Sequence, residues 1–279
     1  MKKACVIGWP VAHSRSPLIH NYWLKHYGLD GLYERREVRP EQLEDFLQNL
    51  AANGYVGCNV TIPHKEAALH TIKNVDDLVR RIGSLNTVYL ENGKTYATST
   101  DGNGFYRNLL ASAPGISLHG KRAVVLGAGG SAKAIIDSLL RAGMAEILVV
   151  NRTSERINNL TELFGAKIQA LPQDRFVTES KTSALLVNTT SMGMSGQPTL
   201  EIDLAHLPTN AVIADLVYVP LQTELLKAAK ARGLRSVGGL GMLLHQAVDG
   251  FEKWFGIRPE VTAELYNYVA RDIDPDFKP

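Results

Sequence analysis

The chain has 279 residues, enough for two modest domains that each bury a core. Hydrophobic residues make up 45% and charged residues 21%, a balance typical of globular proteins. With 30 Lys and Arg against 28 Asp and Glu, the net charge is +2, so composition gives no reason to expect nucleic acid or an anionic membrane as a partner. No apolar run is long enough to span a bilayer, and the first residues lead directly into a strand-like segment, which argues against a signal peptide.

The two cysteines and eight histidines lack the spacing of a metal site. Cys5 and Cys58 both lie in apolar, strand-like runs, and the chain contains no CxxC, HxxxH or HxH pair. We therefore expect no metal, and we interpret both cysteines as reduced core residues of a cytoplasmic protein.

Strand-like and helix-like runs alternate from the first residues, which predicts an α/β fold with parallel sheets. The dipeptide Asn92-Gly93 lies between two short strand-like runs and predicts a type I′ hairpin. The elements expected in this first part are strands at 4–7, 33–38, 57–60, 87–90 and 95–98 and helices at 17–27 and 41–51.

Polar residues gather where these predicted strands end. Ser16 followed by Pro17 predicts a helix start with Ser16 as its cap, and capping alone would explain this serine. Lys65 is expected in the first turn of a helix, where the helix dipole opposes a cation. That placement indicates a function, although a solvated surface lysine is the ordinary interpretation of a lone Lys. Asp101 could simply cap the helix that follows it.

A loop at 113–120 separates this part from a second one, which opens with an apolar strand, a glycine turn and a helix start. Gly127 permits the tight turn, Gly129 lets the backbone approach a pyrophosphate, and Ala132 lets the helix pack close to the strand. Free N–H groups at the helix start would face the phosphates. An ordinary αβ turn is the alternative, but a second strand at 147–150 completes a βαβ unit and favours a dinucleotide site. The elements expected beyond it are strands at 184–188, 212–216 and 235–237 and helices at 240–255 and 260–271, with Pro259 in the first turn of the last helix.

The end of the strand at 147–150 indicates which dinucleotide is bound. An NAD site usually places a carboxylate about 20 residues beyond the glycines, to hold the ribose 2′-hydroxyl. Here the position is Asn151, followed by Arg152, Thr153 and Arg156. Two guanidiniums suit a 2′-phosphate, and Asn151 and Thr153 add neutral hydrogen bonds, although Thr153 could also cap the next helix. The pattern predicts NADP; the alternative is that Arg156 is only a solvated helix residue.

Taken together, these motifs resemble those of the shikimate dehydrogenase family, in order and over nearly the whole chain. The matching segments are 14–17, 59–65, 86–87, 100–102, 127–130, 151–153, 188–194, 215–220 and 239–247. The resemblance implies reversible, NADPH-dependent reduction of 3-dehydroshikimate to shikimate in chorismate and aromatic amino-acid biosynthesis. It also implies two α/β domains: a substrate-binding domain at 1–112, completed by C-terminal helices at 239–279, and a Rossmann-type NADP-binding domain at 113–238. Substrate would bind in the cleft between them, and the protein would be a monomer or homodimer.

The resemblance further assigns roles to individual residues. Lys65 would give and take the proton, with Asp101 as its partner. The implied substrate ligands are Ser14, Ser16 and Tyr218 for the carboxylate, Thr61, Asn86, Asp101 and Gln246 with Lys65 for the ring hydroxyls, and Asn59. The implied cofactor ligands are Gly127, Ala128, Gly129, Gly130 and Ser131 for the phosphates, Asn151, Arg152, Thr153 and Arg156 for the adenosine phosphate, Leu216, Gly239 and Met242 near the nicotinamide, and Asp77.

Three positions differ from the commonest family pattern, and two other functions are compatible with the sequence. Ser99, Ser131 and His245 differ from the commonest family pattern, and these small or polar changes bear on affinity rather than on the reaction. The same fold could act on quinate, or on both quinate and shikimate. A non-catalytic sensor of these ligands is a third hypothesis, which the joint presence of Lys65 and Asp101 disfavours. His64 is expected to be exposed, and the three tryptophans are assigned to packing rather than to the site.

Overall fold

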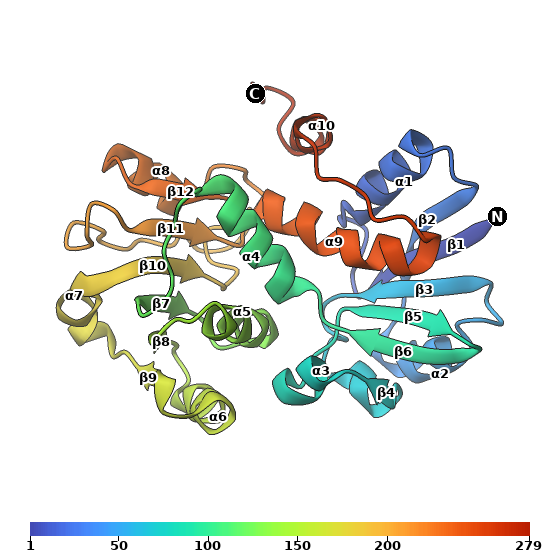
Figure 1. Ribbon diagram of the computed structural model, residues 1–279, viewed down its shortest axis with the longest axis horizontal. Helices are drawn as coiled ribbons and strands as arrows, with labels where there is room; N and C mark the ends of the chain where they lie inside the picture. Colours follow the sequence, from blue (N-terminus) through green and yellow to red (C-terminus); the bar gives the residue numbers. More distant parts are fainter. The chain divides into compact units, whose positions relative to one another are not determined.

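The computed structural model describes residues 1–279, which fold into two compact units (Figure 1). Unit 1 comprises Met1–Asp101 and Leu243–Val269, and unit 2 comprises Gly102–Met242 and Ala270–Pro279. Each unit contains one six-stranded sheet. The expected α/β class is confirmed. None of the helices combines the length and hydrophobicity needed to cross a bilayer.

The sheet of unit 1 is mixed, whereas parallel sheets were expected. Its strands are β1 (Lys2–Gly8), β2 (Gly31–Glu37), β3 (Tyr55–Val60), β4 (Asn74–Val75), β5 (Thr87–Glu91) and β6 (Lys94–Thr98). They lie in the order β2-β1-β3-β5-β6-β4. β1 is parallel to β2 and β3, but β5 pairs antiparallel with both β3 and β6. The expected hairpin joins β5 and β6: Asn92 and Gly93 have φ of 50° and 73°, as a type I′ turn requires.

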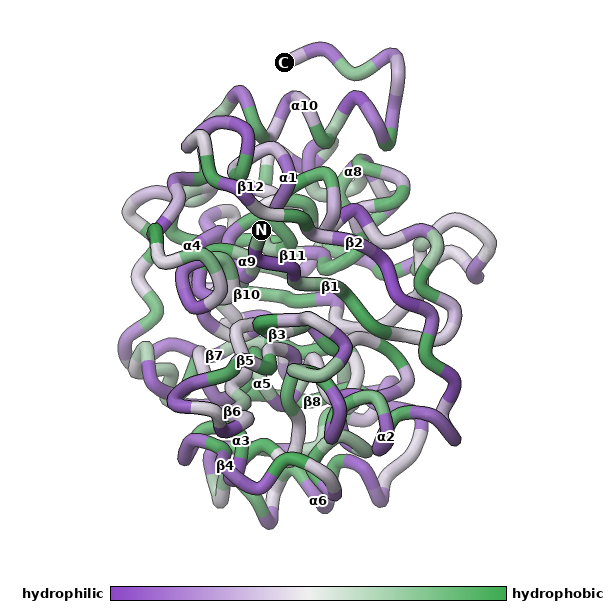
Figure 2. The backbone as a smooth tube through the Cα atoms, turned by 90° about the vertical axis from the view of Figure 1, so that its right-hand side faces the viewer, coloured by the Kyte–Doolittle hydropathy of each residue, from purple (hydrophilic) through white to green (hydrophobic).

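Burial follows strand position in this sheet. β1 is central, and Figure 2 shows it mostly green, whereas the edge strand β2 is mostly purple. Charged residues on an edge strand discourage pairing with another chain. The helical segments of unit 1 before residue 101 are α1 (Ser16–His26), η1 (Pro40–Gln42), α2 (Leu43–Gln48), η2 (Ala67–His70) and α3 (Asp77–Ile82). The helix expected at 41–51 is thus divided into a 3-10 turn and a shorter α-helix.

The sheet of unit 2 is entirely parallel. Its strands are β7 (Arg122–Leu126), β8 (Glu146–Val150), β9 (Ile168–Ala170), β10 (Ser183–Asn188), β11 (Val212–Asp215) and β12 (Arg235–Val237). The order β12-β11-β10-β7-β8-β9 is that of a Rossmann fold, which confirms the expected dinucleotide-binding architecture. The strand order reverses between β7 and β10, and ligands of such sheets bind at the carboxyl ends of the strands beside that point.

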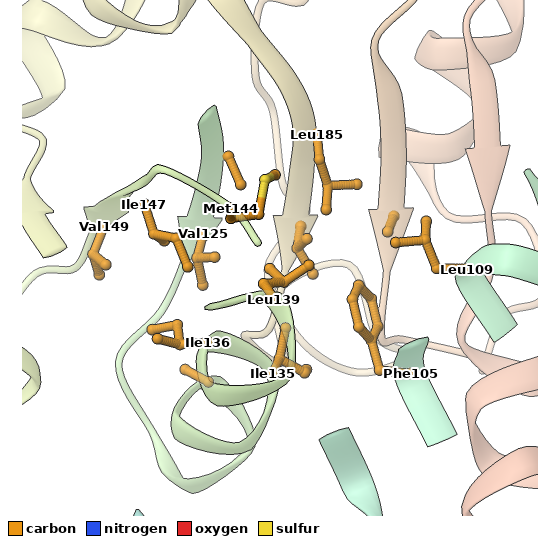
Figure 3. Close-up of a cluster of buried hydrophobic side chains, with 14 of the residues drawn as sticks. Phe105, Leu109, Val125, Ile135, Ile136, Leu139, Met144, Ile147, Val149 and Leu185 are labelled. Carbon is orange, nitrogen blue, oxygen red and sulfur yellow. The ribbon is translucent and has the colours of Figure 1, made fainter. Parts of the chain in front are cut away.

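Both faces of this sheet are covered, which explains why its strands are nearly continuous apolar runs. Val125 and Ile147 point to one side and pack with Leu139 of α5 (Gly130–Arg141), as Figure 3 shows. Val124 and Ile213 lie in a separate core on the other side. The remaining helical segments that lie wholly in this unit are α6 (Ser154–Phe164), η3 (Gly165–Lys167), η4 (Gln173–Arg175), α7 (Phe176–Glu179), η5 (Ser180–Thr182) and α8 (Glu224–Ala231).

Three helices contain a unit boundary: α4 (Asp101–Ser112), α9 (Gly239–Phe255) and α10 (Ala263–Ile273). The domain limits expected from the sequence, at 112 and 239, therefore stay a prediction. Residue 112 ends α4 and residue 239 begins α9, so packing does not mark a domain limit at either position. α10 begins later than expected, because the Thr262 hydroxyl accepts from the Leu265 amide at 3.2 Å and caps the helix there. The placement of Pro259 in its first turn is wrong.

The tryptophans do not all pack in the interior. Trp23 and Trp254 are buried, as expected. Trp9 is 38% exposed, and the Arg39 guanidinium lies 5.0 Å from its ring centroid. Trp9 therefore packs against a cation rather than in the core. Cys5 and Cys58 are buried and free.

Candidate active site

Lys65 lies in a turn after β3 whose backbone is held at two points. The His64 amide donates to the Thr61 carbonyl at 2.9 Å, and the Leu85 amide donates to the Lys65 carbonyl at 3.0 Å. The Leu69 amide, which an α-helix would bond to the Lys65 carbonyl, donates instead to the Glu66 carbonyl at 3.2 Å, and the chain continues into the short 3-10 helix η2. The expectation that Lys65 lies in the first turn of an α-helix is wrong, and the argument from a helix dipole fails with it.

The His64 side chain is buried, which corrects the expectation of an exposed residue. It is 1% exposed, and its Nε2 lies 2.7 Å from the Val38 carbonyl oxygen, just beyond β2. A carbonyl oxygen only accepts, so Nε2 carries a proton and donates it to this bond. The ring thereby fastens the turn that carries Lys65 to the end of a neighbouring segment.

The Lys65 ammonium meets the Asp101 carboxylate, although the two residues are well separated in the chain. Nζ lies 2.5 Å from Oδ2, and the side chains are 18% and 10% exposed. The other carboxylate oxygen, Oδ1, accepts from Nδ2 of Asn86 at 2.7 Å. A partly exposed ammonium beside a fixed carboxylate can exchange a proton with a ligand oxygen that reaches it.

Asn86 joins the polar residues around this ion pair. Its Oδ1 accepts from the Thr100 amide and the Thr87 hydroxyl, both at 2.9 Å. Its Nδ2 donates to Asp101 and lies 3.3 Å from Oε1 of Gln246 on α9. Asn86 is 3% exposed, so these bonds are shielded from water. Unit 1 thus brings together Lys65, Asn86, Asp101 and Gln246, four of the residues that the sequence assigned to the substrate.

Ser14 and Ser16 lie at the start of α1. The Ser14 hydroxyl oxygen accepts from the Ser16 amide at 3.3 Å. The N-cap of α1 is Arg15, whose side chain makes no capping bond. The expectation that Ser16 is the cap is wrong, because Ser16 is already the first helical residue. Its hydroxyl is therefore available to other partners.

Asn59 and Thr61 lie at the carboxyl end of β3. Asn59 is 6% exposed and donates from Nδ2 to the Asn86 carbonyl at 3.1 Å and to the Thr87 hydroxyl at 3.2 Å. Thr61 is half-buried, and its amide donates to the Ile7 carbonyl at 2.9 Å. Thr61 is therefore fixed by β1, whereas the Asn59 amide is occupied by other protein groups.

The glycine turn after β7 has the geometry of a phosphate site. Gly127 has φ of 102°, and a Cβ there would lie 2.7 Å from Oγ1 of Thr189, so only glycine fits. A Cβ on Gly129 would meet nothing within 4 Å. Gly129 is the N-cap of α5 and provides no side-chain cap, which leaves N–H groups at the helix start for an anion. Of the other residues assigned to this turn, Ala128 lies between β7 and α5, and Gly130 and Ser131 are the first two residues of α5.

The residues assigned to the adenosine phosphate follow β8, next to this turn. The Gly127 amide donates to the Val150 carbonyl at 2.8 Å, which joins the ends of β7 and β8. Arg152 and Arg156 are both exposed. Thr153 is the N-cap of α6, but its side chain makes no capping bond; its carbonyl instead accepts from Nδ2 of Asn151 at 2.9 Å. Two cations near a phosphate-binding turn suit a second phosphate.

The loops after β10 and β11 are joined by a buried carboxylate that the sequence did not single out. Asp215 accepts from Nδ2 of Asn188 at 2.9 Å, the Val217 amide at 3.0 Å and the Thr223 hydroxyl at 2.7 Å. Burial raises the pKa of this carboxyl, although the three donors act in the opposite direction. Asp215 thereby fixes the segment that carries Leu216 and Tyr218.

The remaining assigned residues lie at other places in the fold. Gly239 and Met242 begin α9, and the Gly239 amide donates to the Val217 carbonyl at 3.3 Å, next to Leu216. Asp77 is the first residue of α3; its side chain is 92% exposed and pairs with Arg80 at 2.7 Å. No recorded bond connects Asp77 with the residues around Asn86. No group of three or more His, Cys, Asp or Glu side chains is arranged to hold a metal ion.

The comparison with known proteins agrees with this geometry. Residues 6–88 match the family described as the shikimate dehydrogenase substrate binding domain, residues 109–203 match shikimate / quinate 5-dehydrogenase, and residues 239–263 match the shikimate 5'-dehydrogenase C-terminal domain. A protein named shikimate dehydrogenase (NADP(+)) from Rhodopseudomonas palustris is 52% identical over 98% of both chains. The chain belongs to the shikimate dehydrogenase family.

Solved structures of the shikimate dehydrogenase family share the whole fold. The enzyme from Thermus thermophilus, solved with NADP(H) and shikimate, is 37% identical and superposes with a TM-score of 0.86 over 98% of this chain and 100% of its own. A quinate dehydrogenase from Corynebacterium glutamicum, solved with NAD, is 28% identical and has a TM-score of 0.88 over 96% of this chain and 98% of its own. The fold is therefore common to relatives that differ in substrate and cofactor.

Proposed function

We propose that this protein reduces 3-dehydroshikimate to shikimate reversibly, with Lys65 as the proton donor and Asp101 as its partner. As a member of the shikimate dehydrogenase family, the protein is an NADP-dependent oxidoreductase that acts on a CH–OH group in aromatic amino-acid biosynthesis. The observation that carries the residue roles is the 2.5 Å contact between Nζ of Lys65 and Oδ2 of Asp101.

The proton chemistry follows from this contact. Reduction of a ketone leaves an alkoxide, which needs a proton. The Lys65 ammonium donates that proton from Nζ, and in the reverse direction the neutral amine removes it from the alcohol. Asp101 accepts a hydrogen bond from Nζ and so orients the ammonium, while Asn86 holds Asp101 through its second oxygen. Thr61 and Gln246 are proposed as further ligands of the ring hydroxyls, and Ser14, Ser16 and Tyr218 as ligands of the substrate carboxylate.

NADPH supplies the hydride, and the residues of unit 2 fit this cofactor. The open space at Gly129 and the uncapped start of α5 suit the pyrophosphate, and Arg152 and Arg156 suit the 2′-phosphate. Leu216, Gly239 and Met242 are proposed near the nicotinamide. Asn59 and Asp77 stay as proposals from the family pattern; the buried Asn59 amide supports a role behind the ligands rather than in direct contact.

One set of assays tests the function. NADPH oxidation is followed with 3-dehydroshikimate, and reduction of NADP and of NAD is followed with shikimate and with quinate in parallel. We expect the highest kcat/KM with shikimate and NADP. A higher kcat/KM with quinate would show that quinate is the preferred substrate. A preference for NAD would refute the roles of Arg152 and Arg156. Binding of shikimate and NADP without turnover would indicate a sensor.

Two properties of the whole protein are also proposed. We propose a monomer or homodimer, which light scattering at assay concentration tests directly. We propose a cytoplasmic location, which the free, buried Cys5 and Cys58 support because thiols are kept reduced there. Fractionation of the source cells would test the location.

A further inference from the structure

A chain of buried hydrogen bonds continues behind the Lys65–Asp101 pair, into the core of unit 1. The Tyr33 hydroxyl on β2 donates to Oδ1 of Asn59 at 2.6 Å. Asn59 donates in turn to the Asn86 carbonyl and to the Thr87 hydroxyl. Thr87 donates to Oδ1 of Asn86, whose Nδ2 donates to Asp101. Tyr33 is therefore connected to the carboxylate that holds Lys65 through bonds that are all shorter than 3.3 Å.

Tyr33 is also fastened to α1, the helix whose first residue is Ser16. Asn21 of α1 donates from Nδ2 to the Tyr33 carbonyl at 2.8 Å and accepts from the Tyr33 amide at 3.0 Å. Tyr33 thus joins the helix that carries a proposed ligand of the substrate carboxylate to the network around the ion pair.

The Tyr33 ring is held in one place by its neighbours. It is 1% exposed and stacks on His20, with ring centroids 4.0 Å apart and planes at 16°. Trp254 lies 5.7 Å away. Burial raises the pKa of the phenol well above its ordinary value, so the hydroxyl keeps its proton at any pH where the protein works. A fixed, permanently protonated donor determines which end of the Asn59 amide faces it.

We propose that Tyr33 is a positioning residue of the reaction: its hydroxyl, through Asn59, and its backbone, through Asn21 of α1, set the Lys65–Asp101 pair and the substrate carboxylate site relative to each other. This inference rests on the proposed function. Without the hydroxyl, Oδ1 of Asn59 is buried with no donor, and the amide loses the bond that fixes its orientation. Any rotation that brings Oδ1 towards a new donor withdraws Nδ2 from the Asn86 carbonyl and the Thr87 hydroxyl, and so loosens Asn86 and Asp101.

The test replaces Tyr33 by Phe, which keeps the stacked ring. We expect kcat/KM for shikimate to fall about tenfold at every pH from 6 to 9, with KM for NADP unchanged. Tyr55→Phe is the matched control: Tyr55 is also buried in this unit, but its hydroxyl donates to Glu34 at the opposite end of β3. That control is expected to lower stability without changing either KM.

A double-mutant cycle with Asn59→Ala separates positioning from stability. If the Tyr33 hydroxyl acts through Asn59, the two losses in kcat/KM are not additive, and the double variant loses less than the product of the single losses. Wild-type kinetics for Tyr33→Phe, or strictly multiplicative losses, would overturn the inference while leaving the function intact. An inactive wild-type protein would refute the function itself, and this inference with it. Thermal melting of each variant verifies that it is folded.

Discussion

The position of Lys65 depends on contacts that are far apart in the sequence. The Leu85 amide holds its carbonyl, His64 fastens its turn, and Asp101 and Asn86 hold its ammonium. None of these bonds comes from a regular helix, so the side chain is oriented by side chains and loop backbone. Substitutions here should therefore change chemistry more than folding.

Replacing Lys65 by Ala should lower kcat by about 10² or more, with a small change in KM, because the variant loses the group that protonates the alkoxide. Asp101→Asn should also lower kcat, since an uncharged amide orients the Lys65 ammonium less strongly than a carboxylate does. Steady-state kinetics with shikimate and NADP measure both. The control is Lys73→Ala, at an exposed lysine whose Nζ donates to the His70 carbonyl. This substitution should leave kcat and KM unchanged. A Lys65→Ala enzyme with wild-type kcat would remove Lys65 from the mechanism.

His20 should make the stability of the protein sensitive to acid. The ring is fully buried among aromatic side chains, neither nitrogen has a hydrogen-bond partner, and burial lowers its pKa from 6.5 to about 3. Because the pKa of His20 is lower in the folded protein, this side chain is protonated in the unfolded chain but neutral in the folded protein between pH 6.5 and 3. The stabilisation is complete above pH 6.5 and is lost as pH falls towards 3.

Between pH 7 and pH 5 this linkage amounts to about 2 kcal/mol in the free energy of unfolding, on the scale of 1.4 kcal/mol per pKa unit. Urea unfolding at both pH values measures it. In His20→Leu that part of the pH dependence should be absent. An equally steep loss of stability in the variant would assign the effect to other groups.

At the scale of elements, the two glycines of the turn after β7 have different roles. Gly127 is needed for its backbone conformation, and Gly129 is needed for the space that it leaves to a ligand. Gly127→Ala should destabilise unit 2 by about 1–3 kcal/mol, because it places a side chain at φ of 102° and against Thr189. Gly129→Ala should leave stability nearly unchanged, because its Cβ meets no protein atom, yet raise KM for NADP by blocking the approach of the pyrophosphate. Melting curves and cofactor titrations of the pair measure both effects. Equal effects of the two substitutions on both quantities would contradict this division of roles.

The sequence predicted five of the six strands of unit 2, because buried parallel strands are apolar runs with clear limits, and it predicted the first βα turn, because the glycines mark it. It also predicted the hairpin at Asn92-Gly93, where two residues determine the geometry. It did not predict the path of the Lys65 turn, the start of α1 or the burial of His64. These depend on partners such as Leu85 and Val38 that no local pattern reveals.

The site shows the same division. Motifs indicated Asn86, Asp101 and Gln246 individually, but not that Asn86 would bind both of the others. Asp215 and Tyr33 were not assigned a role, since a buried carboxylate that joins two loops and a core tyrosine have no distinctive spacing. Asp215 is detectable only from the register that places Asn188 opposite it in the sheet.

At the scale of the whole molecule, the two units should respond to different ligands. Amide hydrogen exchange with NADP alone should slow at the start of α5 and after β8, in unit 2. Exchange with shikimate alone should slow around Asn86 and Gln246, in unit 1. Each ligand stabilises the part that binds it. Protection by NADP confined to unit 1 would contradict the assignment of the cofactor to the Rossmann sheet.

The uneven burial of the three tryptophans gives the protein an intrinsic optical reporter. Trp23 and Trp254 are buried in the core. Trp9 is partly exposed to solvent, lies against Arg39 and is close in sequence to Ser14. Its fluorescence should be the red-shifted component of the emission and the part that an external quencher reaches. Arrival of an acid such as shikimate near Ser14 could thus be followed by light, without any label.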